Sequence, residues 1–410
     1  MLSRKRVAVL VAALVVVATV FSGCAPQQAE PEKNVITLGA ALSLTGSMAA
    51  EGKLTQEGYD LVVDKVNSQG GVDVGGKKYT LEIKYYDDES NAQRSGNLVE
   101  KLITEDGIKL ILGPYSSGIT VASSVISEKH QAIMIATQGT ANNLYERGFK
   151  YFFGTMGTSS AGPIPGLRAV LEQDPAPKNE AIIAADSLFP LASAQGNRDY
   201  ANSIGLEIVY DEKFPQDVTD LSPILSQVKA LNPDILEVHG FFEHSVLVVK
   251  QLKELGWAPK ALIMDVGPTM PDFPKTLGDD AEYCMSSQYW GTSSNYDDPI
   301  FGSTAQYMEE FNAKYGKEPD YHNVSASVGA MCFVLGIEKA GSLDVDKIRD
   351  EIEKLELDTI YGPLKFSEGH ANIGVPGVVL QVQNGKAVSV WPAEAAGGDM
   401  WYPMPAWNER

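Results

Sequence analysis

The sequence is poor in cysteine and in positive charge. Three cysteines in 410 residues, Cys24, Cys284 and Cys332, are too few for a disulfide-rich scaffold, and no Cys/His cluster has the spacing of a zinc site. Thirty-three basic residues face 53 acidic ones, which gives a formal net charge of −20. Proteins that bind nucleic acids need basic surfaces to displace phosphate counterions. Because the only basic run is residues 4–6, DNA or RNA is disfavoured as a partner.

Catalytic motifs are also missing. The chain has no G-x-S-x-G elbow, no G-x-x-x-x-G-K-[ST] phosphate loop and no G-x-G-x-x-G fingerprint. His239 and His244 lie five residues apart across a strand end, so they do not share a helix face as zinc-protease histidines do. The acidic run Asp87–Glu89 follows a predicted strand and is typical of a solvated strand end and helix cap, with calcium binding as the alternative. The sequence therefore predicts neither a metal site nor a cofactor.

The composition is that of a folded protein, with 44% apolar and 21% charged residues. A chain of this length is expected to form two domains, at roughly 100–200 residues each.

The N-terminus has the features of an export signal. Basic residues at 4–6 precede an apolar stretch of about 15 residues, which is short for a membrane span of roughly 20. The stretch ends in Phe21-Ser22-Gly23-Cys24, which resembles a bacterial lipobox, although Phe21 departs from the usual aliphatic residue. We therefore expect residues 1–23 to be a lipoprotein signal peptide, Cys24 to be lipidated, and residues 24–34 to be a flexible tether. The alternatives are an uncleaved anchor or an ordinary signal peptide.

Strand and helix patterns alternate through the rest of the chain. Short apolar runs at residues 35–42, 79–86, 109–112 and 132–135 predict strands, and apolar residues at helical spacing predict helices between them. The alternation restarts after a Gly/Ser/Thr/Pro-rich passage at residues 154–166, with strands expected at 181–185, 206–210, 235–238 and 261–264. This order predicts two α/β units built on parallel sheets.

The C-terminal third has a different pattern. Residues 291–368 are predicted to be mostly helical, and residues 378–382 and 387–391 to form a hairpin with Asn384-Gly385 as its turn. Residues 72–74 lie between two glycine pairs and are typical of a surface turn. The tail, residues 392–410, holds three aromatic residues between prolines and is expected to lie extended on a domain surface, with docking of a partner as the alternative.

Three loops follow predicted parallel strands at the sheet edge where such folds bind ligands. They are residues 43–52, 113–118 and 137–140, and the last two are rich in hydroxyl groups and glycine. Backbone N–H groups at a helix start, together with serine and threonine hydroxyls, can hold a carboxylate without a basic side chain. The competing interpretation is that these residues are ordinary helix caps.

Several motifs together resemble one family. They are Leu42-Ser43-Leu44-Thr45-Gly46, Glu51-Gly52, residues 66–72 (VNSQGGV), Tyr86-Asp87-Asp88, residues 107–114 and residues 361–366 (YGPLKF). From Val35 to about Val390 the chain resembles the branched-chain amino acid type of ABC transporter substrate-binding protein. The resemblance implies an α/β type I periplasmic-binding fold with two doubly wound parallel-sheet lobes joined by three hinge crossovers. Residues 35–158 and 291–368 would form lobe 1, and residues 159–290 and 369–391 lobe 2.

The resemblance also implies ligand positions. In lobe 1 they are Glu51 on the first loop, where many relatives have an aromatic residue, then Tyr115, Ser116 and Ser117, then Gln138, Gly139 and Thr140. In lobe 2 they are the aromatic residues Phe189 and Phe241 and, where relatives have an acid that pairs with the ligand's ammonium group, Val266 beside Asp265. If Asp265 cannot turn inward, the ammonium pairs elsewhere, with Glu51 for instance, or the ligand is an aromatic carboxylate or amide.

A disulfide of some relatives is absent, since its two positions fall at Ser90 and Ser116, and Cys284 and Cys332 are expected to be free and buried. The function implied is the exported, non-enzymatic solute-binding component of an ABC importer. Its partners would be a small carboxylate-bearing solute, a permease with its ATPase, and the membrane through the lipid on Cys24. Its location would be the outer face of the cytoplasmic membrane or the periplasm. The alternatives are a ligand-sensing receptor of the same fold that acts with a signalling partner, and an exported enzyme.

Overall fold

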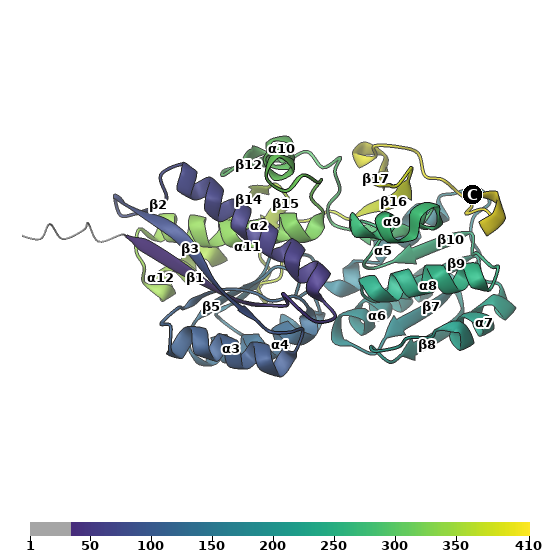
Figure 1. Ribbon diagram of the computed structural model, residues 1–410, viewed down its shortest axis with the longest axis horizontal. Coiled ribbons are helices and arrows are strands. Elements are labelled where there is room, and N and C mark those ends of the chain that lie inside the picture. Colours follow the sequence, from purple (N-terminus) through teal and green to yellow (C-terminus); the bar gives the residue numbers. More distant parts are fainter. Residues whose placement is uncertain (1–33) are drawn as a thin grey trace, which may run out of the picture. The chain divides into compact units, whose positions relative to one another are not determined.

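The computed structural model describes residues 34–410. Cys24, the expected signal peptide and almost all of the expected tether lie outside the described residues. The described chain forms two main β-sheets, each covered by helices on both faces (Figure 1).

The first sheet has the strand order β2-β3-β1-β4-β5-β6. Its strands are parallel except for β2, which pairs with β3 as an antiparallel hairpin. The strands are β1 (Val35–Leu42), β2 (Val72–Val74), β3 (Lys77–Asp87), β4 (Leu110–Leu112), β5 (Ile133–Ala136) and β6 (Phe152–Gly154).

The segment Val72–Val74 corrects one expectation, because it is a strand and not a surface turn. Val72 is fully buried in the core of lobe 1, and the segment pairs with Lys77–Tyr79. Gly75 and Gly76, both with positive φ, form the hairpin turn. The strand is too short to show an alternation of apolar and polar residues. The burial of Val72 and the three residue pairs with β3 stabilise it.

Four long helices cover the first sheet. Helices α2 (Ala49–Ser68) and α11 (Tyr321–Ala340) pack on one face, and α3 (Ala92–Thr104) and α4 (Ser117–Lys129) on the other (Figure 1). Strand β4 shows why both faces of the sheet are apolar. Leu110 and Leu112 pack in the core under α2 and α11, whereas Ile111 packs in the core under α3 and α4.

The second sheet has the strand order β17-β16-β11-β10-β9-β7-β8. Strands β7 to β11 are parallel, and β16 and β17 are antiparallel. The predicted hairpin is confirmed, with Asn384 and Gly385 both at positive φ in its turn. The strands are β7 (Asn179–Ala185), β8 (Glu207–Phe214), β9 (Ile235–His239), β10 (Ala261–Met264), β11 (Met285–Gln288), β16 (Val378–Gln383) and β17 (Lys386–Trp391).

Helices α5 (Ile164–Leu171) and α6 (Leu188–Ile204) cover one face of this sheet. Helices α7 (Ser222–Leu231), α8 (Phe242–Glu254) and α9 (Asp272–Leu277) cover the other. Both faces of this sheet are buried as well, because Leu236 and Val238 of β9 face α8 while Ile235 faces α5.

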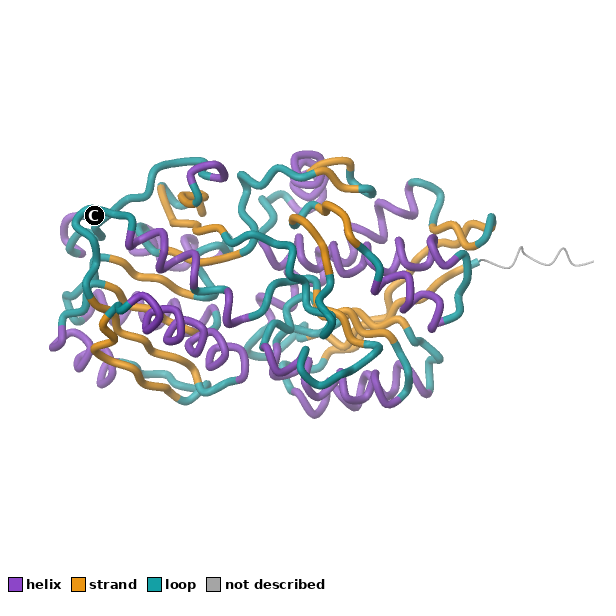
Figure 2. The backbone as a smooth tube through the Cα atoms, turned by 180° about the vertical axis from the view of Figure 1, so that it is seen from behind, coloured by secondary structure: helices purple, strands orange, loops and turns teal. Residues whose placement is uncertain are grey.

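The chain passes three times between the sheets: from β6 to α5, from β11 to α10 (Thr304–Tyr315), and from β15 (Gly362–Lys365) to β16. Figure 2 shows the two groups of strands from behind. This arrangement confirms the predicted fold class. The expected lobe boundaries near residues 158, 290 and 368 fall within these passages and stay predictions.

Residues 291–368 are only about half helical. Besides α10, α11 and α12 (Val345–Glu353) they contain two small antiparallel pairs, formed by β12 (Asp297–Asp298) with β13 (Gly302–Ser303) and by β14 (Glu356–Thr359) with β15. Single 3₁₀ turns lie at Asn142–Leu144, Ser159–Ala161, Gly278–Ala281, Ala393–Ala395 and Trp407–Glu409.

The tail after β17 lies along lobe 2. The Gln381 side chain donates a hydrogen bond to the Trp401 carbonyl at 2.9 Å, the Trp407 indole donates to the Trp257 carbonyl at 2.8 Å, and Met404 is buried in the core. A role of this tail in docking a partner stays a hypothesis.

Cys284 and Cys332 are free and buried, as predicted. Within residues 34–410, none of the helices is by itself long and apolar enough to cross a membrane; α11 and α12, joined by a sharp bend, reach the required length and composition only as a pair.

Candidate functional site

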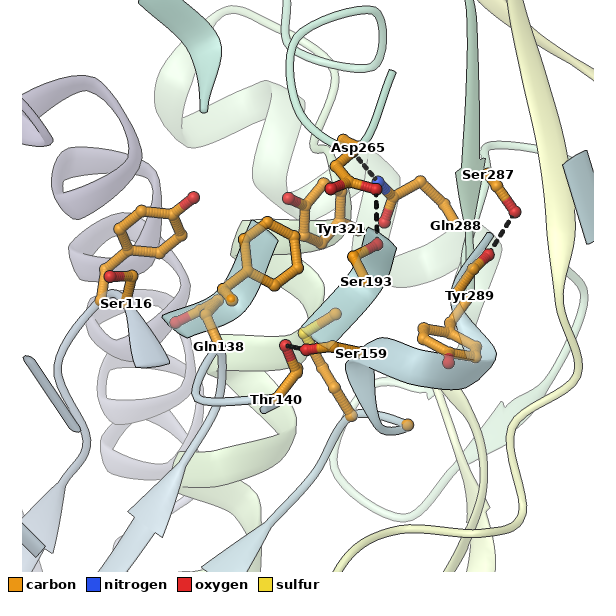
Figure 3. A pocket seen from close by; sticks show the side chains of 15 residues that line it. Ser116, Gln138, Thr140, Ser159, Ser193, Asp265, Ser287, Gln288, Tyr289 and Tyr321 are labelled. Atoms are coloured by element: carbon orange, nitrogen blue, oxygen red, sulfur yellow. Dashed lines mark hydrogen bonds between the residues drawn. The ribbon is translucent and has the colours of Figure 1, made fainter. Parts of the chain in front are cut away.

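A pocket with an empty volume of about 510 Å³ lies among the loops at the carboxyl ends of strands from both sheets (Figure 3). Lobe 1 contributes Tyr115, Ser116, Gln138, Thr140, Met156, Gly157 and Tyr321. Beyond the expected boundary at residue 158 the pocket is lined by Ser159, Gly162, Phe189, Ser193, Asp265, Ser287, Gln288 and Tyr289.

Two residues with aliphatic hydroxyl groups, Ser116 and Thr140, line the lobe 1 side. Ser116 is the N-terminal cap residue of α4, and its side-chain hydroxyl makes no hydrogen bond to another of the described residues. Thr140 shares a 2.9 Å hydrogen bond with the Ser159 hydroxyl. The first amides of α4 lie beside Ser116, and the first amides of a helix have no acceptor within the helix. This wall therefore offers uncharged hydrogen-bond donors.

Ser117 corrects an expectation, since it does not line the pocket. Its side chain is fully buried, and its hydroxyl oxygen accepts the backbone N–H groups of Thr140 at 2.9 Å and Ala141 at 3.1 Å. Ser117 thus joins the start of α4 to the loop after β5. Its role in this structure is to position Thr140.

Gln138 and Gly139 also hold the loop. The Gln138 amide lines the pocket but donates to the His322 carbonyl at 3.0 Å and to the Ser325 hydroxyl at 2.9 Å. Gly139 is absent from the lining, and a Cβ there would lie 2.8 Å from Thr120 side-chain atoms. Close packing against α4 therefore requires glycine.

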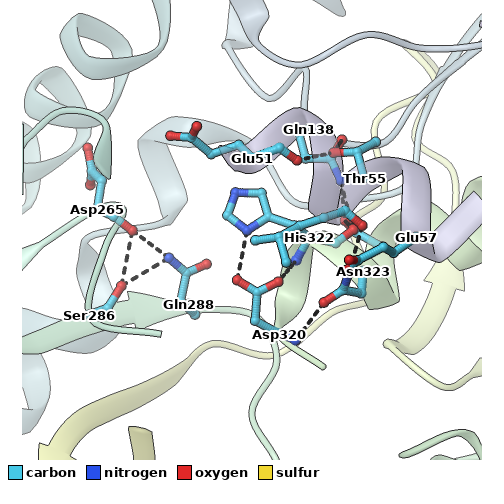
Figure 4. Close-up of polar contacts among 12 residues, drawn as sticks. Glu51, Thr55, Glu57, Gln138, Asp265, Ser286, Gln288, Asp320, His322 and Asn323 are labelled. Atoms are coloured by element: carbon cyan, nitrogen blue, oxygen red, sulfur yellow. Dashed lines mark hydrogen bonds and ion pairs between the residues drawn. The ribbon is translucent and has the colours of Figure 1, made fainter. Parts of the chain in front are cut away.

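Asp265 is the single charged side chain among the pocket-lining residues. It directly follows β10. Its Oδ1 accepts a hydrogen bond from the Ser193 hydroxyl at 2.8 Å and lies 3.1 Å from His239 Nδ1. The Asp265 carbonyl accepts the Ser286 hydroxyl at 3.0 Å and the Gln288 amide at 2.6 Å (Figure 4). Ser193 and His239 thus hold the carboxylate, and Ser286 and Gln288 hold the Asp265 backbone, at the pocket wall.

Val266, aligned with the acid of relatives, lies outside the pocket. It is 1% exposed and packs in an apolar cluster with Leu54 and Met270. Because Leu54 belongs to α2 and Met270 to the loop before α9, this cluster joins the two lobes.

Glu51 also lies outside the lining, in the first turn of α2. It is 1% exposed, and burial is the main cause that raises the pKa of its carboxyl. The nearby His322 ring lowers this pKa, and the Phe242 backbone at the start of α8 lowers it to a smaller extent. Glu51 therefore connects the lobes instead of contacting the pocket.

The predicted aromatic residues gather on one side. Tyr115 and Phe189 line the pocket, whereas Phe241 packs behind them, with ring centroids 6.3 Å from Tyr115 and 5.9 Å from Phe189. Six of the predicted site residues therefore line the pocket: Tyr115, Ser116, Gln138, Thr140, Phe189 and Asp265. Glu51, Ser117, Gly139, Phe241 and Val266 support it.

Sequence reasoning missed the residues at the passages between lobes. Tyr289 lines the pocket directly after β11 and donates its hydroxyl to the Thr158 carbonyl at 2.8 Å. Tyr321 lines it from the first residue of α11 and stacks on His322, whose Nδ1 lies 2.9 Å from an Asp320 carboxylate oxygen (Figure 4). The Gly/Ser/Thr-rich character of residues 154–166 marks only the first passage, which also lines the pocket, and no local signal marks Tyr289 or Tyr321.

Among residues 34–410 no group of three His, Cys, Asp or Glu side chains is arranged to hold a metal ion. His239 and His244 have separate partners: His239 contacts Asp265, and His244 Nε2 lies 2.8 Å from the Gln216 carbonyl.

Comparisons with known proteins agree with this geometry. Residues 35–387 match the periplasmic binding protein family. The chain is 28% identical over 382 residues to a "Leu/Ile/Val-binding protein homolog 8" of Brucella abortus, covering 88% of this chain and 91% of that protein.

Two solved structures share the fold. A leucine-binding protein, LivK, of Thermotoga maritima superposes with a TM-score of 0.78 at 21% identity and covers 87% of this chain and 98% of its own. A solute-binding protein of an ABC transporter from R. palustris, in complex with benzoate, superposes with a TM-score of 0.74 at 17% identity. The match covers 89% of this chain and 99% of that protein. The chain therefore belongs to the periplasmic binding protein family, as an extracytoplasmic solute-binding component of transport and not an enzyme.

Proposed function

We propose that the protein captures a neutral α-amino acid of the branched-chain type and delivers it to the permease of an ABC importer. The observation that carries this proposal is the charge of the pocket lining: one carboxylate, Asp265, and no Lys or Arg. An ammonium group placed against Asp265 completes an ion pair. A buried ion left without its partner costs several kcal/mol.

The carboxylate of the same ligand fits the opposite wall. There Ser116, Thr140 and the first amides of α4 supply neutral donors, and a helix N-terminus favours a negative charge. A zwitterion therefore satisfies both walls at once.

The side chain of the ligand meets apolar surface. Tyr115, Met156, Phe189, Tyr289 and Tyr321 supply rings and a thioether. An aliphatic side chain buried there gains about 25 cal/mol per Å² of apolar surface removed from water.

A second candidate is an aromatic carboxylate, because four of these five residues are aromatic and the R. palustris protein is in complex with benzoate. A benzoate anion would bring a second negative charge close to Asp265 without a cation in the lining. The amino acid is therefore the better match to this pocket.

The test is a thermal-shift and calorimetric screen of the purified protein with leucine, isoleucine, valine, benzoate and 4-methylpentanoate, which is leucine without its ammonium group. A ligand at 100 times its Kd stabilises the folded state by about 2.7 kcal/mol. We expect the amino acids to raise the melting temperature and the two simple carboxylates to have no effect. A shift with benzoate alone would refute the proposal.

Asp265→Asn is the matched site variant, expected to lose the leucine shift while keeping the melting temperature of the free protein. Asp272→Asn is the control, since Asp272 is an exposed aspartate on α9 of the same lobe. If leucine raised the melting temperature of both variants equally, Asp265 would not contact the ligand.

We further propose that Cys24 carries a lipid that tethers the folded part to the outer face of the membrane. Cys24→Ser should release the protein from the membrane fraction without changing leucine binding. Unchanged membrane association would contradict the anchor.

A further inference from the structure

A row of buried polar side chains extends from Asp265 into lobe 2. Glu180 lies on β7, and Glu237 and His239 lie on β9. Ile182 pairs with Glu237, and Ala184 pairs with His239. Since alternate residues of a strand share a face, Glu180, Glu237 and His239 all project from the face that packs under α6.

All three side chains are removed from solvent, with exposed fractions of 0% for Glu180, 1% for Glu237 and 0% for His239. Helix α6 lies over them and contributes Ser193 and Asn197, which are four residues apart and therefore share a helix face. Ser193 donates to Asp265, and the amide of Asn197 lies beside Glu180. The row thus connects the pocket wall to the interior of the lobe.

Several polar atoms of this row have no hydrogen-bond partner among residues 34–410. They are both carboxyl oxygens of Glu180, Oε1 of Glu237, Nε2 of His239 and both amide atoms of Asn197. A buried polar group without a partner costs about 1–3 kcal/mol. Apolar residues would pack this face more favourably, as Ile182 and Ala184 do on the same strand. Such a concentration of costly groups next to a binding site indicates a role there.

Burial disfavours the ionised form of both carboxyl groups of the row. It is the main cause that raises the pKa of Glu180 to about 8; the nearby Asn197 amide lowers this pKa, and the Asp211 carboxyl on β8 makes a smaller contribution that raises it. Burial also raises the pKa of Glu237, with smaller contributions from Glu180 and Asp265. His239 Nδ1 faces Asp265. Helix α6 contributes the uncharged Ser193 and Asn197 to the row, and its Arg198 is ion-paired with Asp211 on β8.

We propose that entry of a ligand's ammonium group beside Asp265 releases a proton from the buried carboxyl groups of Glu180 and Glu237 to solvent. The proposal rests on the proposed function, because it requires an ammonium-bearing ligand. The proton leaves as a free proton taken up by the buffer, and no covalent bond changes. The physical reason is linkage: a positive charge brought close to protonated groups lowers their affinity for protons.

The same linkage makes recognition depend on pH. Where the row still holds its proton, a rise in pH removes the competing proton and strengthens binding of an ammonium-bearing ligand. A ligand without an ammonium group brings no positive charge and releases no proton. The row therefore discriminates amino acids from simple carboxylates.

Isothermal titration calorimetry with L-leucine, at one pH near 7 in buffers of different ionisation enthalpy, counts the protons exchanged on binding. We expect a net release of a measurable fraction of a proton, and tighter binding at pH 8 than at pH 6. Heats that do not depend on the buffer, or net proton uptake, would overturn the proposal.

Two variants test the row separately. Glu180→Gln keeps the shape of the side chain but cannot titrate, so leucine still binds and proton release falls. Glu237→Gln keeps the shape of the side chain and also lowers the release. The control is Glu207→Gln, an exposed glutamate on β8, which should release as many protons as the wild type. Undiminished release in both row variants would exclude the row as the source.

The two proposals fail in different ways. If leucine and the other amino acids neither produce heat nor raise the melting temperature, both proposals fall. If leucine binds with a buffer-independent heat, the proposed function stands and the proton release is refuted.

Discussion

Replacing Glu180 with glutamine should change the pH dependence of stability. Glu180 is fully buried, and the pKa of its carboxyl rises from an ordinary value of 4.5 to about 8, mainly through burial. Between these two values the folded protein holds a proton that the unfolded chain has lost. Stability therefore falls as the pH rises through this window, because the native state binds more protons than the unfolded state.

The size of the effect follows from the same pKa. Each pH unit across which the two states differ by one proton changes the free energy of unfolding by about 1.4 kcal/mol. Between pH 4.5 and about pH 8, the titration of Glu180 can therefore lower the free energy of unfolding of the wild type by at most about 5 kcal/mol. Glutamine has the same shape and does not titrate. We expect the free energy of unfolding of Glu180→Gln, relative to that of the wild type, to increase by at least about 2 kcal/mol as the pH rises from 5 to 8.

Urea denaturation of both proteins at pH 5, 6, 7 and 8 measures this difference. Glu207→Gln serves as the control, since this exposed residue should give a curve parallel to that of the wild type. A constant difference between Glu180→Gln and the wild type over the whole range would refute the reasoning, because it would mean that Glu180 is ionised when buried.

Two further substitutions test the support of the pocket. Ser117→Ala removes the acceptor of the Thr140 and Ala141 amides, so it should lower the free energy of unfolding by about 2 kcal/mol and weaken leucine binding. Urea denaturation measures the first effect and calorimetry the second. An unchanged leucine affinity would show that Thr140 keeps its position without this contact. Glu51→Ala removes the buried carboxyl that lies near the start of α8 between the lobes, so it should weaken leucine binding about tenfold, equivalent to about 1.4 kcal/mol. An affinity equal to that of the wild type would show that this carboxyl does not stabilise the ligand-bound state.

The architecture was predictable because burial on two faces leaves a clear pattern. Continuous apolar runs marked the parallel strands, and Asn384-Gly385 marked the hairpin. Strand β2 escaped because three residues between glycine pairs cannot show alternation. Its existence depends on the burial of Val72, a tertiary contact that no local pattern records.

The site was predictable where it follows the sheet edge. Ser116 and Thr140 lie after β4 and β5, and the rule that parallel sheets bind ligands at their carboxyl ends is enough to find them. The same rule cannot tell which of two adjacent hydroxyls faces the pocket, so Ser117 was assigned to the ligand although it holds a loop. Tyr289 comes from a passage between the lobes and Tyr321 from the start of α11, and the position of both at the pocket depends on tertiary packing and not on local sequence.

Asp265 shows how a difference of one position can leave the chemistry intact. The residue aligned with the acid of relatives is Val266, yet the structure places the preceding carboxylate on the pocket wall and Val266 in the apolar contact between lobes. Four hydrogen-bond partners from three elements fix Asp265, namely Ser193, His239, Ser286 and Gln288. Alignment alone could not show this, because Asp265 and Val266 lie in a bend after β10, where the direction of each side chain depends on the local backbone.

The unequal distribution of charge between the walls explains how closure could select its ligand. Lobe 1 offers neutral donors around Ser116 and Thr140, whereas lobe 2 offers the single carboxylate, Asp265. A conformational change is driven only by the difference in a ligand's affinity for the two states. A simple carboxylate gains its polar contacts from lobe 1 alone and so favours closure little. An amino acid gains contacts from both walls only when the lobes meet, and therefore its ammonium group, more than its side chain, should decide whether the protein closes.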